Sequence, residues 1–177
     1  MLKRIISEIM LIMLLSSVWM FALAIQPAKA EPGTIKVPED YPTIQQAINA
    51  ANPGDTILVS NGIYNENIVV DKTLRLIGED RHYAIINGAT PDGLHGKDTV
   101  NITASGCVLE NFTIINGSRP GKDGVRLNSS NNIVRYNNIC NNRDDGIFVE
   151  SCSNTVANNT ISHNKEVTLF SGVRTTS

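Results

Sequence analysis

The feature that most constrains this chain is a short pattern that recurs along its second half. Asp123-Gly124-Val125-Arg126-Leu127 returns as Asp145-Gly146-Ile147-Phe148-Val149, and a looser copy stands at Asp98-Thr99-Val100-Asn101-Ile102. Apolar residues alternate with polar or variable ones in each copy, which is the period-two pattern of a strand with one buried face. Units of this length with short strands and no helical stripe predict the coils of a β-solenoid.

The leucine-rich repeat is the competing repeat of this length, but the units lack its Leu-x-x-Leu-x-Leu spacing. We therefore predict an all-β fold, a single-stranded right-handed parallel β-helix. The coils should span about residues 56–166, with an irregular tail over 167–177. Strands of the first coils are expected at 56–59, 68–70 and 74–77, and turns at Gly62 and Gly78.

The alternation also predicts which side chains point inward and which point outward. Six apolar residues should face the core: Val125, Leu127, Ile139, Ile147, Val149 and Ile161. Truncation of one of them to alanine should cost about 2–4 kcal/mol. The outward Arg126 should cost under about 0.5 kcal/mol when replaced by alanine.

One helix is predicted before the coils, over about residues 43–52. Thr43 stands at the N-cap and Gln46 occupies the third place after it, which is the spacing of a capping box. Four apolar residues then share one face: Ile44, Ala47, Ile48 and Ala51. Because the first coil would otherwise expose unpaired strand edges, we expect this helix to lie across the start of the solenoid.

Asparagine is the most distinctive residue of the coils, with 14 copies over residues 98–164. Asn137 and Asn159 occupy equivalent places in successive coils, and so do Asn132 and Asn154. Asparagine tolerates the left-handed backbone of a tight turn, and a stacked side chain can donate its amide to the next one. We expect such a ladder at Asn137 and Asn159, the alternative being solvated turn residues without a ladder.

The segment 1–30 differs in composition from the rest of the chain. Lys3 and Arg4 precede an apolar run from Ile9 to Ile25, and Ala28-Lys29-Ala30 follows. This is the pattern of a secretory signal, although the run also approaches the length of an uncleaved membrane anchor. We predict a signal segment over 1–30 and a secreted, periplasmic or cell-surface β-helix domain over 31–177. Contact with a membrane is expected only through the N-terminal segment, if that segment is not cleaved.

Charge and cysteine content restrict the partners and the cross-links. The 15 basic and 17 acidic residues are scattered and give a net charge of −2, so nucleic acid is not an expected partner. Cys107, Cys140 and Cys152 fall at different places in the coils, and no intrachain disulfide is expected.

Several segments near the start resemble the opening of pectin-lyase-like β-helix proteins: Tyr41-Pro42-Thr43-Ile44-Gln45-Gln46-Ala47-Ile48, Pro53-Gly54-Asp55-Thr56-Ile57, Gly62-Ile63-Tyr64-Asn65-Glu66-Asn67-Ile68 and Leu76-Ile77-Gly78. The coils from Asp98 resemble the repeats of NosD-like, carbohydrate-binding and sugar-hydrolase-type (CASH) β-helix proteins. The resemblance covers residues 35–164 and implies the fold; its motif residues are helix, turn and core positions, so it implies little about function.

Pectin methylesterases share this opening, and the resemblance would imply a catalytic pair of aspartates with an arginine and a glutamine on later coils. The chain lacks a Gln-Asp-Thr-Leu segment, its nearest approach being Arg143-Asp144-Asp145-Gly146. It also lacks an Asp-Phe-Ile-Phe-Gly segment. No catalytic residue is therefore carried over to this chain.

A surface for carbohydrate is predicted on the outward places of the repeated strand, from Arg126, Phe148, Asn128 and Glu150. An aromatic ring can stack on a sugar face, while charged and amide groups bond hydroxyls. The alternative is a solvated sheet face with one stray aromatic residue.

A row of carboxylates is predicted at the edge of the coils, from Asp98, Asp123 and Asp145. Carboxylates one coil apart, about 5 Å, could hold Ca²⁺ or act as acid and base on a polysaccharide. The alternative is that each carboxylate accepts backbone N–H groups at a turn. No other cofactor is expected.

Together these features predict an exported protein that binds polysaccharide or cell-surface glycans, or forms part of a surface layer, without catalysis. The alternative is a polysaccharide-acting enzyme, such as a lyase, glycoside hydrolase or pectinesterase-like protein, whose active-site coils are absent or unrecognised in this sequence. The repeat fails at Val167-Thr168, where Asp-Gly is due, so we expect an incomplete β-helix. Five Asn-x-Ser/Thr sequons are candidate glycosylation sites: Asn101, Asn111, Asn116, Asn128 and Asn158.

Overall fold

The computed structural model describes residues 31–88, 98–117 and 122–165, the backbone of 168–169 and 174–176, and residues 6, 8 and 10. The chain divides into two units, Met1–Glu31 and Pro32–Ser177. Almost all of the predicted signal segment lies outside the described residues. Within the described ranges, no helix has the length and apolar character needed to cross a membrane.

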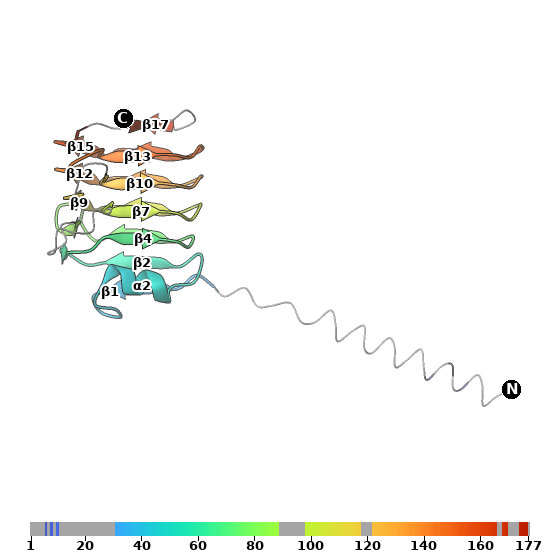
Figure 1. The fold of residues 1–177 in the computed structure, drawn as a ribbon. Helices are drawn as coiled ribbons and strands as arrows, with labels where there is room; N and C mark the ends of the chain where they lie inside the picture. The colour runs from blue at the N-terminus through green and yellow to red at the C-terminus, as the bar shows by residue number, and fades with distance from the viewer. Residues whose placement is uncertain are drawn as a thin grey trace. The chain divides into compact units, whose positions relative to one another are not determined.

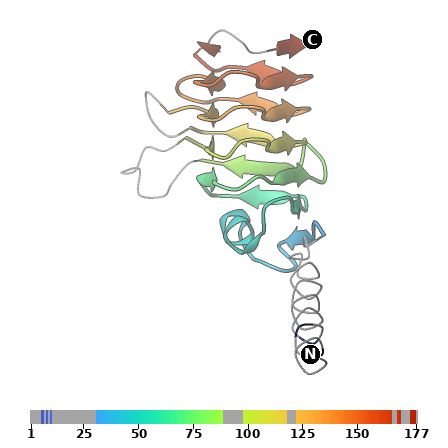
Figure 2. The same ribbon diagram turned by 90° about the vertical axis from the view of Figure 1, so that its right-hand side faces the viewer.

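The second unit is a right-handed parallel β-helix, as predicted, with coils stacked one above another (Figures 1 and 2). Every strand pairs in parallel with the strand of the next coil, which builds three sheets. Sheet A contains β1 (Thr34–Val37), β2 (Thr56–Val59), β5 (Arg75–Gly78), β8 (Val108–Glu110), β11 (Ile133–Arg135), β14 (Thr155–Ala157) and β17 (Arg174–Thr176). Sheet B contains β3 (Gly62–Tyr64), β6 (Ala84–Asn87), β9 (Thr113–Ile115), β12 (Asn138–Cys140) and β15 (Thr160–Ser162). Sheet C contains β4 (Ile68–Val70), β7 (Val100–Ile102), β10 (Val125–Leu127), β13 (Ile147–Val149) and β16 (Thr168–Leu169).

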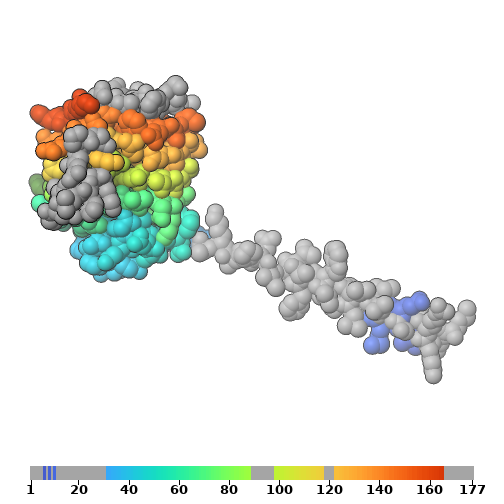
Figure 3. Space-filling model, in the orientation of Figure 1, coloured from blue at the N-terminus to red at the C-terminus, as the bar shows by residue number. Residues whose placement is uncertain are grey.

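The core is a continuous column of aliphatic side chains inside the three sheets. The predicted inward residues Val125, Leu127, Ile139, Ile147 and Val149 are fully buried, and Ile161 packs against them from a partly buried position. In the space-filling view the successive coils form contiguous layers (Figure 3). The alternation in sequence is therefore an alternation between core and surface.

The predicted helix is present as α2 (Ile44–Ala50), with Thr43 as its N-cap. Its four predicted apolar residues are buried, and the Gln46 N–H donates to Thr43 Oγ1 at 3.2 Å. The helix packs against β1, β2 and β4, at the start of the solenoid (Figure 1). The expected N-terminal cap is confirmed.

Side chains from the first coils fix both ends of α2. The Glu66 carboxylate accepts the first two helical N–H groups, at 3.0 Å each. The Lys72 ammonium donates to three carbonyl oxygens at the other end, at 2.7–3.1 Å. Gln45 places its amide against the backbone of Val69 on β4, the end strand of sheet C: Oε1 accepts the N–H at 2.8 Å and Nε2 donates to the carbonyl at 3.4 Å. A side-chain amide thus stands where the next strand of the sheet would be.

Asparagine ladders fasten the coils at three corners. In each ladder the Asn Oδ1 accepts the backbone N–H of the equivalent residue one coil earlier, at 2.8–3.0 Å. The ladders are Cys107–Asn132–Asn154, Phe112–Asn137–Asn159 and Gly117–Asn142–Asn164. The predicted amide stack is confirmed, because Asn137 Nδ2 donates to Asn159 Oδ1 at 3.1 Å.

The left-handed backbone was expected at the ladder asparagines themselves, and this part of the prediction is wrong. Every ladder position is instead preceded by a residue with positive φ: Gly106, Asn131, Ser153, Asn111, Tyr136, Asn158, Asn116, Asn141 and His163. The left-handed residue turns the chain, and the following side chain then points back into the stack. Serine, tyrosine and histidine occupy some of these turns, so the coils require the conformation more strictly than the residue type.

Three local predictions need correction. Gly62 begins β3 and Gly78 ends β5, so neither lies in a turn. Gly78 is required because its backbone lies close to the backbone of Asn111: a Cβ at this position would stand 2.1 Å from the carbonyl oxygen of Asn111. The tail is not wholly irregular, since β16 and β17 continue sheets C and A. Leu169 follows its partner Val149 by fewer residues than Val149 follows its own partner Leu127. The last coil is therefore shorter than the one before it, so counting a full coil onward from Asp145-Gly146 passes the equivalent position.

Candidate functional site

The outer face of sheet C brings together most of the residues predicted to carry function. One outward column runs through Val69, Asn101, Arg126 and Phe148, each paired with the next across the sheet. Their strand neighbours are buried, so this column is the surface that the strands present. Asn128 and Glu150 follow β10 and β13 and are exposed beside it.

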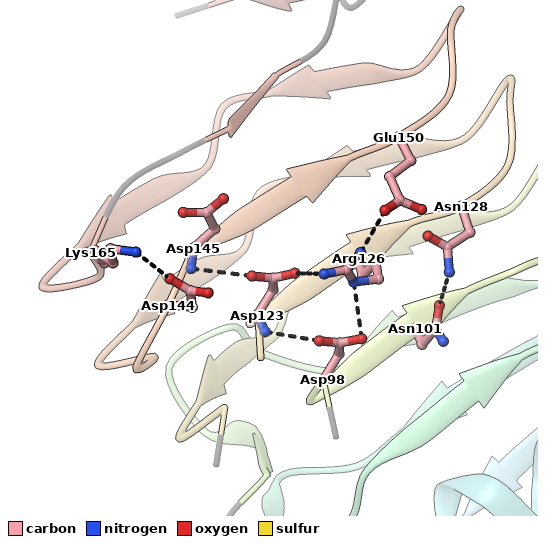
Figure 4. A network of polar contacts seen from close by, with 9 residues as sticks. All are labelled: Asp98, Asn101, Asp123, Arg126, Asn128, Asp144, Asp145, Glu150 and Lys165. Carbon is pink, nitrogen blue, oxygen red and sulfur yellow. Dashed lines mark hydrogen bonds and ion pairs between the residues drawn. The ribbon is translucent and has the colours of Figure 1, made fainter. Parts of the chain in front are cut away.

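Arg126 is the centre of this surface (Figure 4). Its Nε lies 3.2 Å from Asp98 Oδ2, its Nη2 lies 3.0 Å from Asp123 Oδ2, and its Nη1 lies 2.8 Å from Glu150 Oε1. Its Cζ stands 4.3 Å from the centroid of the Phe148 ring. All three guanidinium nitrogens are therefore engaged, and only about a fifth of the side chain, 21%, is exposed.

These contacts change the expectation for Arg126→Ala. Asp98 and Asp123 are buried, with side chains 7% and 2% exposed. Removal of the guanidinium would leave two buried carboxylates without their counter-charge, a kind of loss that costs about 3–5 kcal/mol. The cost of under about 0.5 kcal/mol predicted for Arg126→Ala from its outward position alone is therefore wrong.

The row of aspartates forms a fourth ladder. The backbone N–H of Asp123 donates to Asp98 Oδ1 at 2.9 Å, and that of Asp145 donates to Asp123 Oδ1 at 3.2 Å. One oxygen of each lower carboxylate thus accepts a backbone N–H, and the other faces Arg126. Among the described residues, no group of three or more His, Cys, Asp or Glu side chains could hold a metal ion. Calcium binding at this row stays a prediction.

Burial sets the protonation behaviour of the middle carboxylate. Loss of solvation raises the pKa of Asp123 from its ordinary value of 3.8 to about 6. The guanidinium of Arg126 opposes this rise, and the carboxylate of Asp98 adds to it. Because the side chain is almost wholly buried, Asp123 has no open path for proton transfer to a glycan on the surface.

A hollow of about 260 Å³ adjoins this network on the same face. It is lined by Asn67, Ile68, Val69, Asp98, Asn101 and Lys122. Amide, carboxylate and ammonium groups line it together with the exposed aliphatic side chain of Val69, and Asn128 Nδ2 donates to Asn101 Oδ1 at 3.0 Å. A few convergent polar groups beside apolar surface are the composition of a small-molecule subsite.

The structure brings Arg126, Phe148, Asn128 and Glu150 onto one surface, as the sequence indicates. It restricts the aromatic contact, since the guanidinium of Arg126 lies over the Phe148 ring. Val69 and Lys122 line the hollow but were not among the predicted site residues. Val69 could have been found by aligning residues 68–70 with 100–102, whereas Lys122 carries no signal that marks it.

The five sequons and three cysteines occupy several parts of the solenoid. Asn111, Asn116 and Asn158 have left-handed backbones at corners, and Asn101 and Asn128 lie on the outer face of sheet C. Glycosylation of these residues stays a prediction. The cysteines are free thiols; burial raises the pKa of Cys107 and Cys140, while hydrogen bonding from Ser130 lowers that of Cys152.

Comparisons with known proteins agree with the fold. A family model described as "Protein of unknown function (DUF1565)" matches residues 28–176. A cell surface glycoprotein from Methanothermus fervidus is 31% identical over 115 residues, which cover 64% of this chain and 18% of that protein. Pectinesterase A from Dickeya dadantii is 34% identical over 90 residues, which cover 43% of this chain and 25% of the enzyme. The chain therefore spans a quarter or less of the length of these relatives.

Solved structures show the same architecture. Pectin methylesterase from carrot superposes with a TM-score of 0.59 at 20% identity, over 77% of this chain and 48% of that one. Pectin methylesterase from Erwinia chrysanthemi gives a TM-score of 0.57 at 18% identity, over 77% of this chain and 50% of that one. At this level of identity the likeness concerns the fold alone.

Proposed function

This chain belongs to the DUF1565 family of parallel β-helix proteins, and from that premise we propose that it is an extracellular polysaccharide-binding protein. Its binding site is the outer face of sheet C, with the hollow beside Val69 and Asn101 as one sugar subsite. The observation that carries the proposal is this hollow, which combines amide and ammonium groups with the exposed aliphatic side chain of Val69 on the outer face of sheet C. The named relatives, a cell surface glycoprotein and a pectinesterase, support a role at polysaccharide surfaces.

The chemistry of the subsite suits hydroxyl groups. Asn101 and Asn128 each carry an amide that both donates and accepts, and Lys122 adds an ammonium group that donates. The aliphatic surface of Val69, 38% exposed, can pack against the C–H face of a sugar ring. A glycan chain that lies across the strands would place one ring in the hollow and the next beside Arg126.

Binding is favoured over catalysis because the carboxylates are already committed. Asp98 and Asp123 accept backbone N–H groups and hold Arg126, so neither is poised beside an exposed partner for acid–base chemistry. The alternative, a polysaccharide-acting enzyme, is tested in the same experiment.

The experiment uses residues 31–177 on a glycan array, followed by calorimetric titration of the sugars that bind. Asn101→Ala together with Asn128→Ala should lower affinity by about tenfold or more, because two amide contacts are lost. Thr155→Ala, outward on sheet A, is the matched control and should leave affinity unchanged. Absence of binding to every glycan would contradict the proposal, and release of reducing sugar or methanol would show the enzyme instead.

A further inference from the structure

The outer face of sheet A carries a second cluster of charged residues, built differently from the first. Glu110 points outward from β8, and its side chain is only 11% exposed. Arg135 on β11 donates from Nε to Glu110 Oε2, and Arg75 on β5 places Nη2 3.7 Å from Glu110 Oε1. The two arginine side chains are 52% and 39% exposed, for Arg75 and Arg135 respectively. One shielded carboxylate thus holds two guanidinium groups at the surface.

The charge of this face is positive. On β1, β2, β5, β8, β11 and β14, the outward charged residues are Lys36, Arg75, Glu110 and Arg135. Lys36 is paired with Glu39 at 3.2 Å, so the two arginines against Glu110 leave one positive charge. A carboxylate that must serve two arginines cannot neutralise both, and each guanidinium keeps N–H groups directed away from Glu110.

Most of the other outward residues of sheet A are apolar and half-buried, and the rest are threonines. Four aliphatic residues lie beside the arginines: Leu58, Ile77, Val108 and Ile133. Tyr136 follows Arg135 and is 44% exposed, and the Cζ of Arg135 stands 5.7 Å from the centroid of the tyrosine ring. Aliphatic and aromatic surface of this kind packs against the C–H faces of sugars. The strands are only three or four residues long, so the surface is narrow and carries few cations. Nucleic acids need many contacts between cations and phosphates, so a nucleic acid fits this surface poorly.

We propose that the outer face of sheet A is a separate binding surface for the carboxylate groups of an acidic polysaccharide. The guanidinium fork matches carboxylate geometry, and Glu110 holds the two forks in place before the ligand arrives. Arg75 and Arg135 are two coils apart, which separates their strands by about 9–10 Å. A polymer with regularly spaced carboxylates can engage both while its rings lie on the aliphatic row. This surface shares no residue with the sheet C site and does not depend on it.

The test is calorimetric titration of the full chain with a uronic-acid oligosaccharide and with the same oligosaccharide after its carboxyls are reduced to alcohols. Arg75→Gln together with Arg135→Gln should lower affinity for the acidic sugar by at least about tenfold, since two charge-assisted contacts are lost. Arg143→Gln is the control: it removes an exposed arginine just after β12 of sheet B, away from this face, and should leave affinity unchanged. Glu110→Gln should raise affinity severalfold, because the net charge of the cluster rises by one while the amide oxygen can still accept from the arginines.

A rise in affinity for the acidic sugar in Glu110→Gln distinguishes a binding site from a purely structural ion cluster. If the cluster were only structural, this substitution would lower the stability of the fold and would not raise affinity. Far-UV circular dichroism confirms that each variant is folded, and the arginine pair provides the test if Glu110→Gln is not. Equal binding of the acidic and the reduced sugars, an unchanged affinity in the double arginine variant, or tighter binding of single-stranded DNA would each overturn the proposal. Asn101→Ala with Asn128→Ala should not affect this binding, so a failure here and a failure of the sheet C site are distinguishable.

Discussion

Asn137 gives the sharpest test of how the coils are held together. Its side chain is fully buried, and each of its polar atoms has a backbone partner. Oδ1 accepts the N–H of Phe112 at 3.0 Å, and Nδ2 donates to the carbonyl of Leu109 at 3.0 Å. Nδ2 also donates to Asn159 Oδ1 at 3.1 Å. One amide therefore satisfies two backbone groups of the preceding coil and joins it to the following one.

Asn137→Ala removes all of these bonds at once. Phe112 and Leu109 are themselves buried, so water cannot replace the lost partners. Each orphaned buried group costs about 1–3 kcal/mol, which gives about 2–6 kcal/mol for the pair. Asn128→Ala is the matched control: its amide is exposed and bonded to Asn101, and its loss should cost under about 0.5 kcal/mol.

The measurement is urea denaturation of residues 31–177, followed by far-UV circular dichroism. Hydrogen exchange at the N–H groups of Phe112 and Asn138 adds a local readout, because a solenoid can open coil by coil. A cost for Asn137→Ala no larger than that for Asn128→Ala would show that the ladder is not a source of stability. Faster exchange spread evenly over distant coils would contradict its local action.

Single contacts elsewhere in the solenoid give three further predictions. Because the pKa of Asp123 is raised to about 6 in the folded state, its contribution to the free energy of unfolding should fall by about 3 kcal/mol as pH rises from about 3 to about 7, and Asp123→Asn should remove this part of the pH dependence in urea titrations at several pH values. Glu66→Ala should cost about 1–2 kcal/mol and speed hydrogen exchange across α2, since two helical N–H groups lose their acceptor; unchanged exchange there would contradict the capping role. Gly78→Ala should destabilise the fold by more than about 2 kcal/mol, against under about 1 kcal/mol for Gly33→Ala, whose added Cβ would stand 3.4 Å from Asp55 Oδ1; thermal melts that rank the two variants equally would refute this.

The sequence could predict the coils because their physics is periodic. Inward residues such as Val125 and Ile147 repeat at the coil spacing, since a core column must be apolar at each level. The ladder at Asn137 and Asn159 repeats for the same reason. The strand β1 was missed because it belongs to no repeat and is recognisable only through its pairing with β2.

The interactions on the outer faces were not predictable in the same way. Arg126 was expected to be a free surface residue, because its outward place says nothing of which neighbours its long side chain reaches. Its partners Asp98 and Glu150 lie in the coils before and after its own. Contacts of this kind depend on side-chain rotamers and on diagonal distances between residues of neighbouring strands. The repeat pattern in the sequence gives neither of these. The same holds for Arg75 and Glu110, which are not direct partners across their sheet.

The two outer faces differ in how many carboxylates each arginine meets, and this difference carries a functional consequence. On sheet C, the single charge of Arg126 meets three carboxylates, so this cluster has no positive charge left for an acidic ligand and recognition rests mainly on the amides of Asn101 and Asn128. On sheet A, Arg75 and Arg135 share one carboxylate, so charge is left over for an acidic ligand. Salt weakens contacts between exposed charges and leaves hydrogen bonds between neutral groups largely unaffected. Binding to sheet C should therefore persist at high ionic strength while binding to sheet A is lost, and a single chain with both surfaces could join a neutral glycan to an acidic one under low salt only.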